Sequence, residues 1–184
     1  MSHVKKLRSD VVRHRAALLD AAARVFAAHG VHASLDLVVE AAGVGRATLY
    51  RHFADRQALL LALVDRTMEP LLKAGEGGPP GDVLIARITE LGRTVRAATA
   101  LADAWRAVAP DQTALQQRQR KLLDSCRKPL ADAIAAGNVR PDLTLDDVSQ
   151  VMRMVVAANG QHQADDDASR RIIDLVVSGM GRRA

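Results

Sequence analysis

The residues best suited to chemistry lie between positions 34 and 56, where a glycine-containing turn separates two short helical stretches. The second stretch begins Arg46-Ala47-Thr48, and residues at the start of a helix that enters the DNA major groove should be small or able to hydrogen-bond to base edges. Tyr50, Arg51 and His52 follow, and their side chains can all donate to phosphate oxygens. The spacing predicts a DNA-recognition helix. Short helical hairpins also occur in bundles that bind no DNA, so spacing alone leaves that alternative open.

Two helices, over residues 35–42 and 46–52, are expected to position these side chains, and both have clear start and stop signals. The Ser34 hydroxyl can cap the first helix, and Gly43-Val44-Gly45 breaks it. Leu49 and Phe53 are four residues apart, so both should face the core and anchor the second helix. Two helices joined in this way form a helix-turn-helix.

The whole chain is predicted to be all-α, with about nine helices in all, because apolar residues recur at helical spacing and no stretch alternates like a strand. The first helix should run over residues 10–29 and stop at Gly30, and Asp55 should cap the fourth. A glycine- and proline-rich linker is expected over residues 74–82. Further helices are expected around residues 84–95, 101–108, 115–134 with a kink at Pro129, 145–156 after a Thr144 cap, and 165–180.

The charge of the chain favours an anionic partner. Its net charge is +5 and its pI about 10.0. Residues 1–66 hold ten lysines and arginines against six acidic residues, so most of the excess lies in the first third. Lys5, Lys6 and Arg8 could form a flexible arm along a DNA backbone, although a solubilising tail is the simpler interpretation of this stretch taken alone. A single cysteine and the absence of a long apolar stretch predict a cytoplasmic protein.

Residues 34–60 resemble the DNA-binding signature of the TetR family of bacterial regulators. The turn Ala42-Gly-Val44, the block Thr48-Leu-Tyr-Arg-His-Phe53 and the basic residue Arg56 stand in the order of that signature. The resemblance covers roughly residues 10–66. It implies a helix-turn-helix domain over residues 1–56, followed by a regulatory and dimerisation domain over residues 57–184.

The resemblance also implies roles for individual residues in contacting DNA. The residues concerned are Ser34, Gly45, Arg46, Ala47, Thr48, Tyr50, Arg51, His52 and Arg56. Two of the family's usual residues are replaced: Val39 stands where an alanine is usual, and Gly45 where a serine is usual. Gly45 cannot offer a side-chain cap to the helix or a hydroxyl to a phosphate, so we expect weaker anchoring of the motif to the DNA backbone.

As implied by the family, the protein should be a homodimeric repressor that binds a palindromic operator on double-stranded DNA and is released by a small-molecule ligand. The residues expected to line a ligand pocket are Met68, Leu101, Trp105, Leu122, Cys126 and Met152. Those expected at the dimer interface are Val148, Met152, Val155, Ile172, Val176 and Met180. Ordinary core packing is the simpler interpretation of many of them. Because Trp105 is the only aromatic residue after Phe53, an aliphatic or small polar ligand fits better than a planar dye.

An enzyme is the main competing class, and the sequence offers no complete catalytic, metal or cofactor site. Cys126 lies on an apolar helical stripe, which favours an inert thiol. His29 and His32 lack further zinc ligands, and the acids at 165–167 are explained by a helix start. The glycines at 77–81 lack the lysine of a phosphate loop. A protein with the same fold that sequesters a ligand without regulating DNA remains the second alternative.

Overall fold

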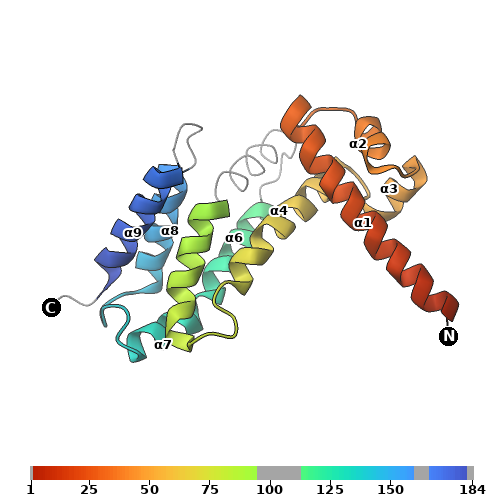
Figure 1. Ribbon diagram of the computed structural model, residues 1–184. Helices are drawn as coiled ribbons and strands as arrows, with labels where there is room; N and C mark the ends of the chain where they lie inside the picture. Colours follow the sequence, from red (N-terminus) through yellow and green to blue (C-terminus); the bar gives the residue numbers. More distant parts are fainter. Residues whose placement is uncertain (1, 95–112, 160–165, 182–184) are drawn as a thin grey trace. The chain divides into compact units, whose positions relative to one another are not determined.

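The computed structural model describes residues 2–94, 113–159 and 166–181, and within these ranges every regular element is a helix (Figure 1). The labelled elements are α1 (Ser2–His29), α2 (Leu35–Ala42), α3 (Arg46–His52), α4 (Arg56–Lys73), η1 (Pro80–Asp82), α6 (Thr113–Ser125), α7 (Arg127–Ala135), α8 (Leu145–Asn159) and α9 (Asp166–Met180). A further helix is described over residues 83–94. The all-α class is therefore confirmed, with a helix count close to the expected nine.

The described residues divide into two compact units, one up to Val64 and one from Asp65 onward. Helix α4 runs through this boundary. None of the helices described is both long and apolar enough to cross a membrane. The helix expected around residues 101–108 lies outside the described residues.

The first unit is built around a small core of side chains from α1, α2, α3 and the start of α4. Leu18, Val38, Leu49 and Leu59 are almost completely buried. Helix α1 ends where predicted, because Gly30 adopts a φ of 78° and its N–H donates to the Phe26 carbonyl at 3.0 Å. The turn after α1 brings α2 back along it (Figure 1).

The start of α1 differs from the prediction. We expected residue 10 to begin the helix, with Lys5, Lys6 and Arg8 before it in a basic arm or a solubilising tail, but the backbone is helical from Ser2. Nothing in this segment opposes a helix, because residues 2–9 contain no glycine or proline and are rich in residues that favour helices. Asp10, the expected first residue, lies inside the helix and pairs with Arg13 at 2.8 Å.

The second unit has a larger core. Leu84, Ile88 and Leu91 of the 83–94 helix meet Val148 and Val155 of α8 in one cluster of buried side chains. The end of the predicted linker belongs to this unit: Gly81 is buried against α7, and Asn138 Nδ2 donates to Asp82 Oδ1 at 2.6 Å. The segment over residues 74–82 is therefore a connection whose final turn, η1, packs against the unit.

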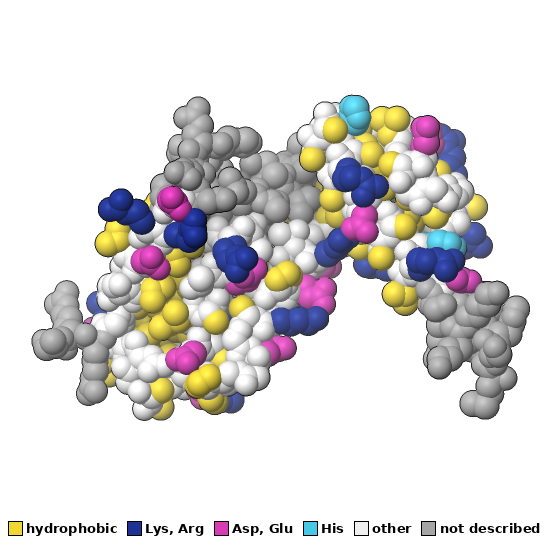
Figure 2. All heavy atoms as spheres, viewed as in Figure 1, with side chains coloured by type: hydrophobic (Ala, Val, Ile, Leu, Met, Phe, Trp, Pro, Cys, Tyr) yellow, Lys and Arg dark blue, Asp and Glu magenta, His cyan; other side chains and the backbone are white. Residues whose placement is uncertain are grey.

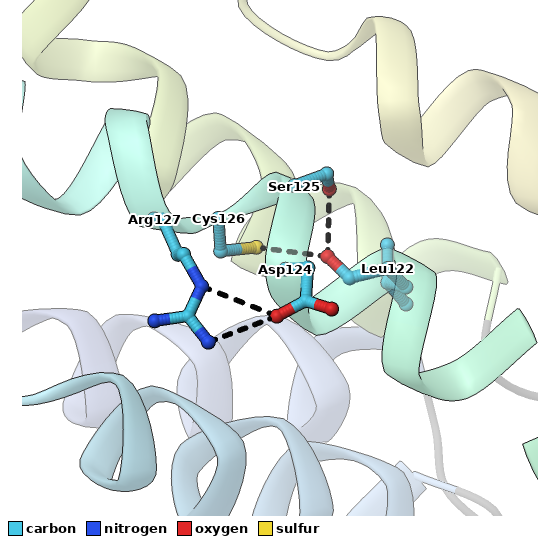
Figure 3. Close-up of polar contacts among 5 residues, drawn as sticks. All are labelled: Leu122, Asp124, Ser125, Cys126 and Arg127. Atoms are coloured by element: carbon cyan, nitrogen blue, oxygen red, sulfur yellow. Dashed lines mark hydrogen bonds and ion pairs between the residues drawn. The ribbon is translucent and has the colours of Figure 1, made fainter. Parts of the chain in front are cut away.

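The long helix expected over residues 115–134 is two helices, because the chain breaks at Cys126 rather than at Pro129. Figure 3 shows the junction, where Ser125 Oγ and Cys126 Sγ both donate to the Leu122 carbonyl, at 2.6 and 3.5 Å. In a continuous helix the Ser125 carbonyl would accept from residue 129, but proline has no N–H. Arg87 Nη1 donates to that carbonyl instead, at 2.8 Å. Pro129 thus favours a break in the helix about one turn before its own position.

Two other predicted helix starts are confirmed by side-chain caps. The Ala58 N–H donates to Asp55 Oδ1 at 2.7 Å at the start of α4. At the start of α8, the Asp147 N–H donates to Thr144 Oγ1 at 3.1 Å, while the Thr144 N–H donates to Asp147 Oδ2 at 2.9 Å. This reciprocal pair satisfies two N–H groups that a helix start leaves unbonded.

Candidate nucleic-acid interface

Helix α3 has one buried face and one exposed face. Leu49 and Phe53 are 1% and 3% exposed, which confirms that they anchor the helix in the core. Tyr50 is 54% exposed, and Arg46 and Arg51 are also exposed. Figure 2 shows Lys, Arg and His side chains over the part of the first unit that contains α2 and α3. The outward face of α3 therefore presents donors that the protein core does not use.

The turn between α2 and α3 is set by three local features. The Asp36 N–H donates to Ser34 Oγ at 3.1 Å, so Ser34 is the N-cap of α2 as predicted. Gly43 ends α2 with a φ of 64°, a conformation that disfavours residues with a side chain. Gly45 occupies the N-cap of α3 with no side-chain hydrogen bond, as the missing serine led us to expect.

Arg46, the first residue of α3, is paired with Asp36 in the first turn of α2. Its Nε and Nη2 atoms donate to the two carboxylate oxygens of Asp36 in a side-on, two-bond arrangement. These hydrogen bonds from Arg46 lower the pKa of the Asp36 carboxyl below its ordinary value. Sequence reasoning missed Asp36, because the two residues are ten positions apart and only the fold of the turn brings them together.

The remaining polar residues of α3 are arranged along the helix. Arg51 folds back along α3, with Nε donating to the Ala47 carbonyl at 3.2 Å and Nη2 to Thr48 Oγ1 at 3.3 Å. Both contacts are long and exposed, so they are easily exchanged for contacts with another acceptor. Thr48 is half-buried and Ala47 is exposed.

His52, at the end of α3, is half-buried and lies among positive groups. Burial lowers the pKa of its imidazole below the ordinary value, and the charges of His14, Arg15 and Arg51 lower it further. The Arg15 guanidinium lies 5.3 Å from the centre of the Phe53 ring, which places α1 beside the end of α3. The sequence gave no sign that Arg15, in the middle of α1, adjoins the end of α3.

Arg56, at the start of α4, is engaged within the first unit. Its Nη1 donates to the Val31 carbonyl at 2.5 Å, and its guanidinium carbon lies 5.7 Å from the centre of the Phe26 ring. The side chain therefore holds the start of α4 against the turn that follows α1. A guanidinium has five N–H groups, so this engagement is compatible with a further acceptor.

The second unit brings together the described candidates for the ligand pocket. Leu122 and Cys126 belong to its main hydrophobic cluster, and Met68 and Met152 pack against that cluster. Burial raises the pKa of the Cys126 thiol above its ordinary value, which fits an inert thiol. Leu101 and Trp105 lie outside the described residues.

The residues expected at the dimer interface separate into two groups. Val148, Val155 and Met180 are buried within this chain's own core. Met152 and Val176 are partly buried against that core, and Ile172 is half-buried. The large apolar side chains left exposed on α8 and α9 are others, Met154, Val156 and Leu175. In the region of α8, Figure 2 shows a strip of hydrophobic side chains.

A capped helix-turn-helix with a polar outward face, followed by a second helical unit, defines the class of helix-turn-helix transcriptional regulators. Residues 18–63 match the family model of the bacterial regulatory proteins of the tetR family, and residues 79–182 match that of the SbtR-like transcriptional regulator C-terminal domain. The chain belongs to the TetR family. The family and the relatives that match this chain are transcriptional regulators rather than enzymes, as the sequence predicted.

Solved structures and curated proteins support this membership. The chain is 31% identical to a TetR regulatory protein from Mycobacterium vanbaalenii, with a TM-score of 0.71 over 96% of this chain and 99% of that one. It is 38% identical over 94 residues to an HTH-type transcriptional regulator of Mycobacterium tuberculosis, covering 48% of this chain and 46% of that protein. It is 38% identical over 82 residues to the transcriptional repressor LfrR of Mycolicibacterium smegmatis, covering 42% and 43%. The chain thus spans less than half the length of these two curated relatives.

Proposed function

We propose that this protein is a homodimeric transcriptional repressor that binds a palindromic operator through α2 and α3 and is released when a small molecule binds its second unit. The observation that carries the proposal is that α3 has two distinct faces. Leu49 and Phe53 are buried in the core, whereas Tyr50, Arg46 and Arg51 are exposed. A solitary exposed tyrosine among guanidinium groups has no packing role. It has the chemistry of a phosphate contact.

The proposed contacts with DNA are of two kinds, to base edges and to phosphates. Arg46, Ala47 and Thr48 at the start of α3 face base edges, with Arg51 beside them, and Tyr50 and His52 donate to phosphates. Ser34 and Gly45 bring backbone N–H groups at helix starts close to phosphates. Arg56 adds a charge beside them, and Lys5, Lys6 and Arg8 extend the contact along α1. The functional boundary then falls at residue 56, with residues 57–184 regulating the motif.

Coupling between the second unit and the DNA-binding motif is proposed to run through α4. Arg118 of α6 donates to both carboxylate oxygens of Asp65 on α4, at 2.6 and 3.0 Å. Arg87 of the 83–94 helix donates to the Leu72 carbonyl near the end of α4, at 2.9 Å. A ligand that moves these helices would also move α4, and it would weaken DNA binding only if it bound the DNA-incompetent arrangement more tightly. Met68, Leu122, Cys126 and Met152 are the proposed lining within the described residues of the second unit.

The test is fluorescence anisotropy with labelled duplexes tiled across the DNA upstream of the protein's own coding sequence, at two salt concentrations. We expect tight, salt-sensitive binding to one palindrome at two chains per site. Tyr50→Phe should weaken binding to every duplex, because it removes one hydroxyl donor from an exposed ring. Arg56→Ala should do the same and reduce the salt slope by about 0.9 for the phosphate contact it loses.

Two comparisons make the test specific. Lys128→Ala removes an equal charge from α7 and should leave the DNA affinity unchanged, since Lys128 pairs with Asp132 far along the chain from the motif. Arg56→Ala should also lower the melting temperature, because it deletes the Val31 contact, whereas Tyr50→Phe should not. Weak binding that is equal for all duplexes, confirmed by random-sequence selection, would instead favour a ligand-sequestering protein with this fold.

A further inference from the structure

The ion pair between Arg46 and Asp36 links the first residue of the recognition helix to the first turn of the preceding helix. It uses Nε and Nη2 of the guanidinium against both carboxylate oxygens. The side chains are 69% and 53% exposed. Exposed ion pairs contribute little to folding, because water screens them and two long side chains must be held in place. Its main consequence is therefore the orientation of Arg46.

The side-on geometry leaves a defined part of the guanidinium available. A guanidinium has five N–H groups in one plane, and the pair with Asp36 uses one edge, formed by Nε and Nη2. The adjacent edge, formed by Nη1 and the second N–H of Nη2, carries two parallel donors. Two parallel donors match the O6 and N7 acceptors that guanine presents in the major groove.

We propose that Asp36 is a positioning residue that holds Arg46 with its free guanidinium edge toward one guanine in each half of the operator. This inference rests on the proposed DNA-binding function and adds a residue and a base to it. Without Asp36, the Arg46 side chain would move among rotamers and reach phosphates on either side, so its charge would still attract DNA but would no longer distinguish bases.

The carboxylate of Asp36 also acts on affinity, in the opposite direction. It places a negative charge near the DNA backbone, which lowers the affinity for every duplex. Its removal should therefore raise non-specific affinity while it lowers selectivity. A residue that merely stabilised the fold would change neither property in this way.

The test is selection of binding sites from a random duplex library, followed by affinity measurements on the selected site and on a version with the guanine replaced. We expect the wild type to select one guanine at symmetric positions in the two half-sites. Asp36→Ala should reduce the discrimination between guanine and the other bases by about two- to fivefold, the range that an exposed ion pair supplies. Asp36→Asn should give the same loss, because an amide cannot accept both hydrogen bonds. Arg46→Ala should remove the guanine preference.

Control variants separate orientation from charge and from folding. Glu40→Ala removes the same charge from an exposed position at the other end of α2, so it should raise affinity without changing the base preference. The double variant Asp36→Ala/Arg46→Ala should lose no more discrimination than Arg46→Ala alone, since both residues act through one contact. Thermal melts that match the wild type show that the variants are folded.

The outcomes distinguish this inference from the proposed function. An Asp36→Ala protein that keeps its full guanine preference overturns the positioning role, and an Arg46→Ala protein that keeps it overturns the base contact. In both cases specific binding by the wild type would leave the proposed function standing. A wild type that selects no sequence at all would overturn both.

Discussion

His52 is a single residue whose protonation is expected to respond to DNA. Burial and the neighbouring charges of His14, Arg15 and Arg51 lower the pKa of its imidazole in the free protein. A phosphate oxygen beside the ring would favour the charged form and raise that pKa in the complex. Binding would then take up a proton, so affinity should rise as the pH falls through the bound-state pKa and level off below the free-state pKa.

The measurement is the dissociation constant for the operator at constant ionic strength, in steps from about pH 8 to about pH 5.5, around the ordinary histidine pKa. His52→Gln should flatten this dependence and weaken binding at low pH, whereas His29→Gln, at the exposed end of α1, should not. An unchanged dependence in the His52 variant would assign the proton to another group, with His14 the next to substitute.

Single residues also show where prediction from sequence succeeds. Leu49, Phe53 and the Ser34 cap could be predicted because each is determined by helical spacing or by a neighbour within a few positions. The partners of Arg46 and Arg56 could not, since Asp36 and Val31 lie ten and twenty-five positions away. Sequence spacing indicates which face a side chain occupies, but only the packed fold shows which distant group it meets.

At the scale of single elements, α3 lacks the cap that most helices of its kind would have. Gly45 has an extended backbone with a negative φ, and a Cβ built there meets nothing within 4 Å. Gly45→Ser should therefore fit without strain, cap α3 and reduce the freedom of the unfolded chain. We expect a gain of a few tenths to about 1 kcal/mol in stability.

The measurement for this variant pairs thermal melting with DNA affinity. Gly45→Ala serves as the control, since it restricts the unfolded chain without adding a hydroxyl. The serine variant should exceed the alanine variant in melting temperature and bind all duplexes more tightly, because the hydroxyl adds a phosphate donor. If the alanine variant gains as much in both measurements, the missing cap is of no consequence.

In the second unit, Gly92 allows the 83–94 helix to approach α9 closely. A Cβ at Gly92 would lie 2.1 Å from Ile173 Cδ1 and 2.7 Å from Ile173 Cγ1, and Ile173 is itself buried. Gly92→Ala should destabilise the protein by about 1–3 kcal/mol through overpacking. Chemical denaturation measures the loss.

Ile173→Val removes the nearest atom and provides the matched test of this contact. Combined with Gly92→Ala, it should recover part of the lost stability, so the two substitutions should be less than additive. Strict additivity would mean that the helices adjust by moving apart and that the close approach is not required.

The elements themselves were predicted with uneven success, according to whether the signals that set each boundary lie within a few positions of it. The bounds of α2 and α3 were predicted correctly because a cap and glycines mark them. The start of α1 was missed because no cap or helix breaker marks a boundary before Asp10. The break at Cys126 was missed because its hydrogen bonding involves a distant residue. Pro129 has no N–H for the Ser125 carbonyl, and Arg87, thirty-eight positions away, donates to that carbonyl instead.

At the scale of the whole molecule, the basic charge and the exposed apolar side chains bear on which partners the chain binds. Most of the excess of basic residues lies within the first 66 positions, and α8 and α9 leave Met154, Val156 and Leu175 exposed. Leu175 is 74% exposed and Met154 58%. Exposed apolar side chains on adjacent helices are typical of a surface that meets a partner, and a second copy of the chain is the partner that the proposed palindromic operator would require.

Leu175→Glu should therefore yield a monomer. It places a charge on the surface proposed to be buried in the dimer, where an unpaired carboxylate is strongly unfavourable. The fold of each chain should persist, because Leu175 contributes little to the protomer's own core. Sedimentation measures the mass. Operator affinity should fall by roughly a hundredfold or more, since two half-sites would no longer be bound as one linked unit.

Leu72→Glu is the matched control, because it makes the same change at an exposed leucine near the end of α4. It should leave both the mass and the affinity unchanged. Affinity for a single half-site separates the two effects of the Leu175 substitution: a monomer with an intact motif keeps this weak binding while it loses the gain from a second half-site. A Leu175→Glu protein that remains dimeric with full operator affinity would place the dimer interface on another surface of the second unit.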